Sequence, residues 1–329
     1  MRVLVTGGCG FIGSNFIRYI LQHYKPVYVT NVDALTYAGN LANLDGVVEE
    51  HGERYEFFQG DIANADQMDA LMTDHQFYAV INFAAESHVD RSINSPQNFI
   101  HTNVVGTSVL LDAARRHNVQ RFLQISTDEA YGSLGATGKF TEESPLDPTS
   151  PYSSSKAGAD LLALAYHKTY GLEVLVTRCS NNYGPCQFPE KLIPLMIISA
   201  LRDQPLPVYG DGLNVRDWIH VEDHCAAIVA ALFKGKPGKI YNVGGDGEMP
   251  NLEVVKLILD TLGKPHSLIS FVTDRLGHDR RYAIDSSFAQ RELEWRPLHN
   301  AREGIAATVE WYLNNRSWWE PLLERTGWH

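Results

Sequence analysis

The sequence predicts an α/β fold, in which a doubly wound parallel sheet is followed by a smaller C-terminal domain. Short aliphatic and β-branched runs alternate with amphipathic stretches up to about residue 180, as is typical of parallel strands connected by helices. The first run leads directly into a glycine-rich turn, and beyond residue 182 prolines become frequent and the alternation fades. We therefore expect domains at 1–180 and 181–329, with a segment near 217–245 returning to the first domain.

The expected elements follow one another in a regular order. The six expected strands are Val3–Thr6, Val27–Asn31, Tyr55–Gln59, Ala79–Phe83, Phe122–Ser126 and Val174–Arg178. Helical patterns fall at Phe16–His23, Met68–Met72, Val105–His117 and Tyr152–Tyr170, where apolar residues recur at helical spacing. The run Lys239–Val243 is followed by two glycines, so it is a candidate for the returning strand.

Composition and net charge argue against several classes of protein. The 329 residues carry a net charge of −11, which argues against binding to nucleic acid or to an anionic membrane surface. The four cysteines, at 9, 179, 186 and 225, lack metal-ligand spacing, so we expect neither a metal site nor disulfides. The apolar segment Leu192–Leu201 is too short to span a bilayer. With no signal-peptide pattern at the amino terminus, these features predict a cytoplasmic protein.

A phosphate-binding turn is predicted by "TGGCGFIG", where Gly7, Gly10 and Gly13 follow the first strand and open a helix. Such glycines let the backbone approach a diphosphate at the helix amino terminus. Asp33 lies 20 residues beyond Gly13, where a carboxylate can bind both ribose hydroxyls and repel a 2′-phosphate. NAD is therefore favoured over NADP. The alternative is a tight turn that binds no ligand.

A tyrosine and a lysine share one face of a predicted helix. Tyr152 and Lys156 lie four residues apart in "SPYSSSKAGAD", a spacing that brings side chains together on a helix. An ammonium beside a phenol lowers the pKa of the phenol, and such a phenol can accept a hydroxyl proton while hydride leaves the same carbon. The pair therefore indicates a dehydrogenase site, whereas an isolated surface pair is the alternative.

Two adjacent carboxylates end the fifth strand. In "QISTDEAYGS", Asp128 and Glu129 follow directly on a buried apolar run. Adjacent side chains of an extended chain point to opposite faces, so the two acids should not perform one task together. A solvated acidic turn is the simplest interpretation, because surface carboxylates are common.

Taken together, these motifs give the chain a clear family resemblance. It resembles the extended short-chain dehydrogenase/reductase family, with its Rossmann-type fold, and most closely the 4,6-dehydratases that act on dTDP-glucose. Ala130 and Leu276 depart from the pattern without removing a reactive group. The resemblance spans residues 4 to 285 and is carried by "VTGGCGFIGSNF", "DALTYAGN", "FAAESHVDRSI", "TNVVGT", "STDEAYGS", "SPYSSSKAGAD", "TRCSNNYGP", "PEKLIPL", "YGDGLNVRDWIHVEDHC" and "DRLGHDRRYAID".

The resemblance implies an activity in which both acids take part. The implied reaction converts dTDP-glucose to dTDP-4-keto-6-deoxyglucose and water with internal recycling of NAD, as in deoxysugar or rhamnose biosynthesis. Glu129 would remove the C5 proton and Asp128 would protonate the departing C6 hydroxyl. Thr127 would contact the sugar near O4 and assist Tyr152, while Lys156 completes the catalytic group. A homodimer formed through a four-helix bundle, from 105–116 and 152–170 of each copy, is also implied.

The resemblance further implies two sets of binding residues, without a catalytic role for His88. The cofactor set comprises Gly7, Gly10, Phe11, Ile12, Gly13, Asp33, Ala34, Leu35, Thr36, Asp61, Ile62, Phe83, Ala84, Ala85, Glu86, Ser87, Thr102, Tyr152, Ser155, Lys156 and Asn182. The nucleotide-sugar set comprises Ser87, Thr127, Asn181, Lys191, Leu192, Pro207, Val208, Tyr209, Arg216, Asn251, Asp274, Arg275 and His278.

Three alternatives remain open at this point. A nucleotide-sugar 4-epimerase would use the same cofactor, Tyr152 and Lys156, but it needs no C5 base or C6 acid. A GDP-mannose-type dehydratase would carry a single acid where this chain has Asp128 and Glu129. A non-enzymatic NAD sensor would not need the reactive groups. Because thymine and uracil differ by one methyl group, sequence physics alone does not distinguish dTDP from UDP.

Overall fold

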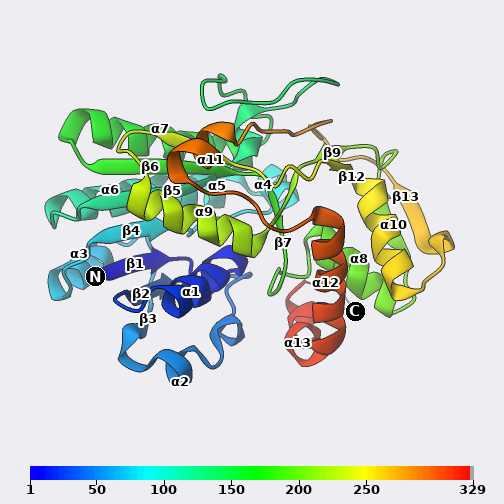
Figure 1. The fold of residues 1–329 in the computed structure, drawn as a ribbon, viewed down its shortest axis with the longest axis horizontal. Coiled ribbons are helices and arrows are strands. Elements are labelled where there is room, and N and C mark those ends of the chain that lie inside the picture. The colour runs from blue at the N-terminus through cyan, green and yellow to red at the C-terminus, as the bar shows by residue number, and fades with distance from the viewer. Residues whose placement is uncertain (327–329) are drawn as a thin grey trace.

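The computed structural model describes residues 1–326, and within them seven parallel strands form one sheet (Figure 1). The sheet has the order β11-β6-β5-β4-β1-β2-β3. The chain therefore starts in the middle and winds outward in both directions, as in a Rossmann-type fold, and the predicted fold class is confirmed. The strands are β1 (Arg2–Thr6), β2 (Tyr28–Asp33), β3 (Tyr55–Gln59), β4 (Ala79–Asn82), β5 (Arg121–Thr127), β6 (Glu173–Cys179) and β11 (Ile240–Val243).

Helices cover both faces of this sheet (Figure 1). One face packs against α1 (Phe11–His23), α9 (Val221–Lys234) and α11 (Ser287–Leu293). The other packs against α3 (Ala65–Asp74), α6 (Thr107–Arg116) and α7 (Pro151–Tyr170). Side chains alternate between the two cores along a strand, so in β1 Val3 and Val5 enter one core while Leu4 enters the other.

The run predicted as a returning strand lies at the edge of the sheet. Strand β11 pairs in parallel with β6, with Tyr241 opposite Thr177. Its place shows that the chain comes back to the sheet after leaving it near residue 180. The domain division at that residue remains a proposal.

The remaining C-terminal elements surround a separate hydrophobic cluster. Helices α8 (Leu192–Leu201), α10 (Asn251–Leu262), α12 (Ala301–Asn314) and α13 (Arg316–Thr326) contribute to it. Three short strand pairs lie beside them: β7 (Asn181–Tyr183) with β10 (Trp218–His220), β9 (Val215–Arg216) with β12 (Met249–Pro250), and β8 (Leu206–Tyr209) with β13 (Ile269–Val272).

Short helical segments complete the connections. They are the helices α2 (Val47–His51), α4 (Val89–Asn94) and α5 (Pro96–Phe99), and the 3-10 turns η1 (Leu41–Leu44), η2 (Gly52–Arg54), η4 (Asp128–Tyr131) and η5 (His266–Leu268). None of the helices among residues 1–326 has both the length and the apolar character required to cross a membrane.

One helix begins differently from the prediction. The pattern at 105–117 predicted a single helix, but α6 is preceded by a π-helical segment, η3 (Ile100–Gly106). Apolar periodicity does not distinguish these two windings, and π segments often occur at functional sites. Here the wider turn lets the Asn103 amide donate to Glu86 O (3.0 Å) and accept from Glu86 N (2.9 Å). The segment after β4 is thereby fixed beside the sheet.

Candidate active site

A cavity of about 320 Å³ lies at the carboxyl ends of the parallel strands. Parallel sheets bind ligands at this edge, at the point where the strand order reverses. Its walls come from the glycine-rich turn after β1, the ends of β2, β4 and β5, the start of α7, and the segment from β7 to Lys191. The cavity therefore collects side chains from segments far apart in the sequence.

The glycine-rich turn requires glycine at two positions, because a side chain at either would collide with neighbouring backbone. Gly7 has a φ of +69°, and a Cβ there would lie 2.6 Å from Ala84 N. A Cβ on Gly13 would lie 2.4 Å from Gly7 O. Helix α1 starts after Gly10 without a side-chain cap, which leaves its first amides available for an anion. These features fit the diphosphate of NAD.

Asp33 is held in position for a ribose. Its Oδ2 accepts from Cys9 N (2.8 Å) and its Oδ1 accepts from Leu35 N (2.8 Å). Burial raises the pKa of this carboxyl, and the two backbone hydrogen bonds oppose that rise. Each oxygen keeps a free lone pair, so both can still accept from ribose hydroxyls.

We expect Asp33→Asn to weaken NAD binding about tenfold, the loss typical of one charge-assisted hydrogen bond. The amide cannot accept from both Cys9 N and Leu35 N, and it no longer repels a 2′-phosphate. Titration calorimetry with NAD and NADP measures both affinities. An unchanged ratio of the two would contradict the assignment of Asp33. Asp74→Asn is the control, since Asp74 is exposed at the end of α3 and lies outside the cavity wall.

The two acids do not project from an extended chain. Residues Asp128–Tyr131 form a 3-10 turn, η4, capped by Thr127, whose Oγ1 accepts from Glu129 N (3.2 Å). The backbone turns immediately after β5, so both carboxylates line the cavity. Asp128 is only 1% exposed, and its Oδ2 lacks a hydrogen-bond partner among the described residues. The expectation of a solvated acidic turn was therefore wrong.

The surroundings shift the pKa values of the two acids to different extents. Burial and then the charge of Glu129 raise the pKa of Asp128 well above its ordinary value. Burial also raises the pKa of Glu129, but three cations oppose that rise: Arg216, Lys191 and Arg275. Such a difference is typical of a pair in which one member acts as an acid and the other as a base. Asp128 is the better proton donor and Glu129 the better proton acceptor.

Tyr152 and Lys156 lie in the first turns of α7, which Ser150 caps through a capping box with Ser153. Both line the cavity, as predicted. The expected pKa shift of the phenol is not found, however. Burial and then Glu129 raise the pKa of Tyr152 well above its ordinary value, and a hydrogen bond with Thr127 opposes the rise. The Lys156 ammonium instead donates to Ile125 O (2.7 Å).

A buried ion pair supports this end of the cavity. Asp160 accepts from Ser126 Oγ and from Arg178 Nε, both at 2.9 Å. Burial lowers the pKa of Lys156, and the charge of Asp160 opposes this effect. The carboxylate thus helps to keep Lys156 protonated, one helical turn away.

Most residues of the predicted cofactor set line the cavity, and two do not. Leu35 lines a neighbouring opening, and its backbone amide binds Asp33. Ser155 points instead to Asn103, whose Nδ2 donates to it (2.8 Å). The set on the cavity wall comprises Gly7, Gly10, Phe11, Ile12, Gly13, Asp33, Ala34, Thr36, Asp61, Ile62, Phe83, Ala84, Ala85, Glu86, Ser87, Thr102, Tyr152, Lys156 and Asn182.

The predicted nucleotide-sugar set divides into two groups. Ser87, Thr127, Asn181 and Lys191 line the cavity, and Lys191 Nζ donates to Ser87 O (2.8 Å). The others lie outside its wall, on C-terminal elements: Leu192, Pro207, Val208, Tyr209, Arg216, Asn251, Asp274, Arg275 and His278.

The second group is itself compact. The Arg275 guanidinium lies 5.1 Å from the Tyr209 ring centroid, and His278 Nδ1 lies 2.5 Å from Asp274 Oδ1. Arg216 donates to Asp279 O (2.9 Å) and lies over the Tyr282 ring. Since Arg216 and Arg275 both influence the pKa of Glu129, this group adjoins the acidic end of the cavity.

Several residues of the cavity wall were not predicted from the sequence. Tyr37 and Phe188 face each other edge-on, with ring centroids 5.7 Å apart. Glu190 lies 3.3 Å from Arg91 and 3.5 Å from His88 Nε2, where burial lowers the pKa of the histidine to about 4. Tyr37 lies in "DALTYAGN" and Glu190 in "PEKLIPL", each next to a predicted residue. Proximity to those residues was the only available signal.

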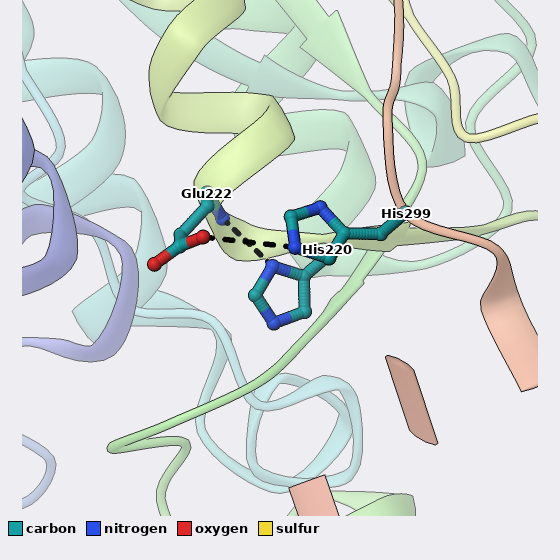
Figure 2. Close-up of side chains that lie close together, drawn as sticks. All are labelled: His220, Glu222 and His299. Atoms are coloured by element: carbon teal, nitrogen blue, oxygen red, sulfur yellow. Dashed lines mark hydrogen bonds and ion pairs between the residues drawn. The ribbon is translucent and has the colours of Figure 1, made fainter. Parts of the chain in front are cut away.

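One cluster outside the cavity has the residue types of a metal site. His220, Glu222 and His299 offer ligand atoms within 4.8 Å of one another (Figure 2). However, the two imidazoles are stacked, with centroids 4.0 Å apart, so their in-plane lone pairs do not converge on one point. His220 Nδ1 also accepts from Glu222 N (3.3 Å). A metal would require the rings to change their relative orientation, and the expectation of no metal site stays a prediction.

Known nucleotide-sugar dehydratases are similar to this chain over nearly its whole length. Residues 4–308 match the sequence profile of the family described as GDP-mannose 4,6 dehydratase. A dTDP-glucose 4,6-dehydratase of Xanthomonas campestris is 54% identical, over 98% of this chain and 95% of the relative. One from an Actinoplanes species is 52% identical, over 97% of this chain and 100% of the relative.

Solved structures of related enzymes share the fold of this chain. A dTDP-glucose 4,6-dehydratase from Streptomyces venezuelae, crystallised with NAD, superposes with a TM-score of 0.95 at 50% identity and covers 98% of this chain and 100% of that one. A UDP-glucose 4-epimerase from Thermotoga maritima reaches a TM-score of 0.89 at 28% identity, over 96% of this chain and 100% of that one. The fold is thus shared by both enzyme classes, while the higher identity is to the dehydratase.

Proposed function

The chain belongs to the dTDP-glucose 4,6-dehydratases of the extended short-chain dehydrogenase/reductase family, and on that premise we propose how its residues carry out the reaction. It is an NAD-dependent hydro-lyase that converts dTDP-glucose to dTDP-4-keto-6-deoxyglucose and water. The observation that carries the assignment is the pair Asp128 and Glu129 on one cavity wall with Tyr152 and Lys156. Oxidation at C4 needs only Tyr152 and Lys156, whereas loss of water also needs Asp128 and Glu129.

The residues act on three neighbouring carbons of the hexose. Bound NAD supplies a hydride acceptor for C4 and returns the hydride to C6. Tyr152 accepts the proton of the C4 hydroxyl, and Thr127, which already hydrogen-bonds to this phenol, orients it. In the free protein, burial and then Glu129 raise the pKa of Tyr152, so in this proposal Tyr152 ionises only when NAD and substrate are bound. Lys156, one helical turn away, supplies a positive charge on the same side of the cavity.

The acids then remove water. The ketone at C4 acidifies the C5 proton, which Glu129 accepts. Asp128 donates its proton to the C6 hydroxyl, so that the C–O bond breaks and water leaves. Glu129 returns a proton to C5 as hydride arrives at C6. Tyr152 then releases the proton that it accepted and Asp128 takes one up, both by exchange with solvent. The atoms therefore balance: one water is lost, and C6 becomes a methyl group.

A cationic group binds the nucleotide diphosphate in this proposal. Arg216 and Arg275 present planar guanidinium groups, which suit paired phosphate oxygens. The Tyr209 ring lies against the Arg275 guanidinium, and we assign Asn251 and His278 to the same binding group. The same cations lower the pKa of Glu129, so a diphosphate that partly neutralises Arg216 and Arg275 makes Glu129 a stronger base as substrate binds.

Turnover of sugar nucleotides tests the function. The purified protein is incubated with dTDP-glucose, UDP-glucose and GDP-mannose, with NAD present, and the ultraviolet absorption of the 4-keto product is read after addition of alkali. We expect the highest kcat/KM with dTDP-glucose. Formation of dTDP-galactose without a keto product would indicate a 4-epimerase instead, and the absence of any conversion would indicate a sensor.

We propose further that two copies associate through α7 and the segment before α6. Leu161 and Tyr170 on α7 are 58% and 56% exposed, and Ile100 and Val105 on η3 are 47% and 43% exposed. Exposed apolar side chains grouped in this way are typical of an interface with another chain. A second copy supplies matching helices, as in a four-helix bundle.

We expect Leu161→Glu to convert the dimer to a monomer, because a carboxylate at each copy of this position would be buried without a partner. Sedimentation velocity at micromolar concentration measures the change. Leu298→Glu serves as the control, since Leu298 is 86% exposed and lies outside these helices. A Leu161→Glu variant that stays dimeric would contradict this interface.

We also propose that the enzyme acts in the cytoplasm. Cys9, Cys179, Cys186 and Cys225 are all unpaired, and three of them are buried. Free buried thiols suit a reducing compartment.

A further inference from the structure

A continuous line of hydrogen bonds connects the C-terminal helix to the cofactor site. Trp318, on α13, donates from its indole Nε1 to Asn43 Oδ1 (2.9 Å). Asn43 donates from Nδ2 to Cys9 O (2.9 Å), and Cys9 N donates to Asp33 Oδ2 (2.8 Å). The line thus runs from one end of the chain to the carboxylate assigned to the ribose.

The two middle residues of this line, Asn43 and Cys9, are buried, so they have little freedom to move. Asn43 is 2% exposed and Cys9 is fully buried. Cys9 stands inside the glycine-rich turn, between Gly8 and Gly10, so a shift of its peptide moves the turn and the partner of Asp33 together. Buried polar groups that lose a partner are costly, and the line is therefore expected to behave as one unit.

A second set of contacts fixes the same segment on its other side. Arg18, on α1, donates from Nε to Asn43 O (3.0 Å) and from Nη2 to Asp45 O (2.7 Å). Arg325, on α13, donates to Gly39 O (3.1 Å). Gly39 lines both the cavity and the neighbouring opening, whose wall also includes Arg325. Helix α13 therefore supports the wall at the adenosine end of the site.

We propose that Trp318 and Asn43 are positioning residues for NAD. They do not touch the reacting atoms. Through Cys9 they hold the glycine-rich turn and the Asp33 carboxylate in the arrangement that binds the diphosphate and the ribose. The proposal rests on the NAD site described above, but not on which sugar nucleotide the enzyme converts.

Trp318→Phe tests the line while keeping an aromatic ring for the contact with Trp311, whose centroid is 5.0 Å away. We expect the Kd for NAD to rise about tenfold, the change typical of losing one buried hydrogen bond. At saturating NAD, kcat should stay within twofold of the wild-type value. Trp319→Phe is the matched control: it removes the neighbouring indole N–H, which donates to Tyr312 O (2.9 Å) within the C-terminal core. It should lower Tm and leave the Kd for NAD unchanged.

Asn43→Asp provides the second variant. The carboxylate can still accept from Trp318 but can no longer donate to Cys9 O, so it breaks the line on the other side. In the double variant, Asn43→Asp with Trp318→Phe, the Kd should equal that of Asn43→Asp alone, since two breaks in one line do not add.

Calorimetric titration of NAD into protein stripped of nucleotide, with no sugar present, measures these constants. A Kd within twofold of wild type in Trp318→Phe, an equal rise in Trp319→Phe, or fully additive effects in the double variant would overturn the proposal. Turnover of dTDP-glucose by the wild-type enzyme is read separately. If the wild-type enzyme turns over dTDP-glucose but the Kd for NAD is unchanged in Trp318→Phe, this inference alone is refuted. If the wild-type enzyme binds NAD normally but does not turn over dTDP-glucose, the proposed function alone is refuted.

Discussion

Replacement of Glu129 by glutamine is expected to reduce kcat for the loss of water by about 10³-fold, within the range typical of general-base catalysis. The side chain keeps its size, and Glu129 N still binds Thr127, so nucleotide binding should change little. Oxidation at C4 does not use Glu129. In a single turnover the bound cofactor should therefore become reduced and stay reduced, which its near-ultraviolet absorbance reports.

The pH dependence gives a second measure of the same residue. A base must be ionised to accept a proton, and burial raises the pKa of Glu129 above its ordinary value of 4.5. In the wild-type enzyme kcat should therefore fall as the pH drops through that raised pKa. Asp128 must be protonated, and its pKa is also raised, so kcat should fall again as the pH rises through the pKa of Asp128. Glutamine at 129 should remove the acid limb. It should also move the alkaline limb to lower pH, because the charge of Glu129 contributes to the raised pKa of Asp128.

Glu142→Gln is the control for this variant. Glu142 is another partly buried carboxylate with a raised pKa, but it accepts from Asn242 N (2.8 Å), away from the cavity. Its kcat should lie within twofold of the wild-type value. Normal loss of water by Glu129→Gln would show that a different group removes the C5 proton.

Replacement of Tyr152 by phenylalanine is expected to lower kcat by a similar factor of about 10³, but at an earlier step. Without the phenol oxygen no group accepts the C4 hydroxyl proton, so hydride transfer from C4 should stop. In a single turnover the cofactor should remain oxidised, in contrast to the result with Glu129→Gln. The comparison assigns each residue to its own step.

Tyr183→Phe controls for the loss of a buried hydroxyl. Tyr183 is fully buried, and its hydroxyl has no hydrogen-bond partner within residues 1–326. Its removal should therefore leave the reduction of the cofactor intact. Normal cofactor reduction in Tyr152→Phe would exclude the phenol as the proton acceptor.

Most of the six N-terminal strands were predictable because they are buried on both faces, and such strands appear as continuous apolar runs. The edge strand β3 is only partly buried, and its aromatic residues provided the signal. The 3-10 turn at 128–131 was not predictable in the same way. Its geometry depends on Thr127 capping Glu129 N, and a short turn leaves no periodic signal. The predicted pKa of Tyr152 failed for a related reason. Sequence spacing indicated the nearby ammonium, but the burial and the carboxylate that dominate come from the tertiary structure.

The residues around the nucleotide could be predicted only by resemblance. Tyr209 and His278 lie on segments far apart in sequence, yet their rings are 6.2 Å apart. No local pattern in a single sequence predicts such a contact. The six N-terminal strands, by contrast, follow from local alternation, whereas the run at 239–243 could be named only as a candidate for the returning strand β11.

The position of β11 has a consequence for synthesis of the protein. During translation β6 emerges more than 60 residues before its outer neighbour, since β6 ends at Cys179 and β11 begins at Ile240. Throughout that interval the backbone amides and carbonyls along one side of β6 lack their ladder partner, and an open strand edge can pair with another nascent chain. Until β11 has been made, the open edge of β6 is therefore a site at which the nascent chain can aggregate and at which a chaperone would protect it.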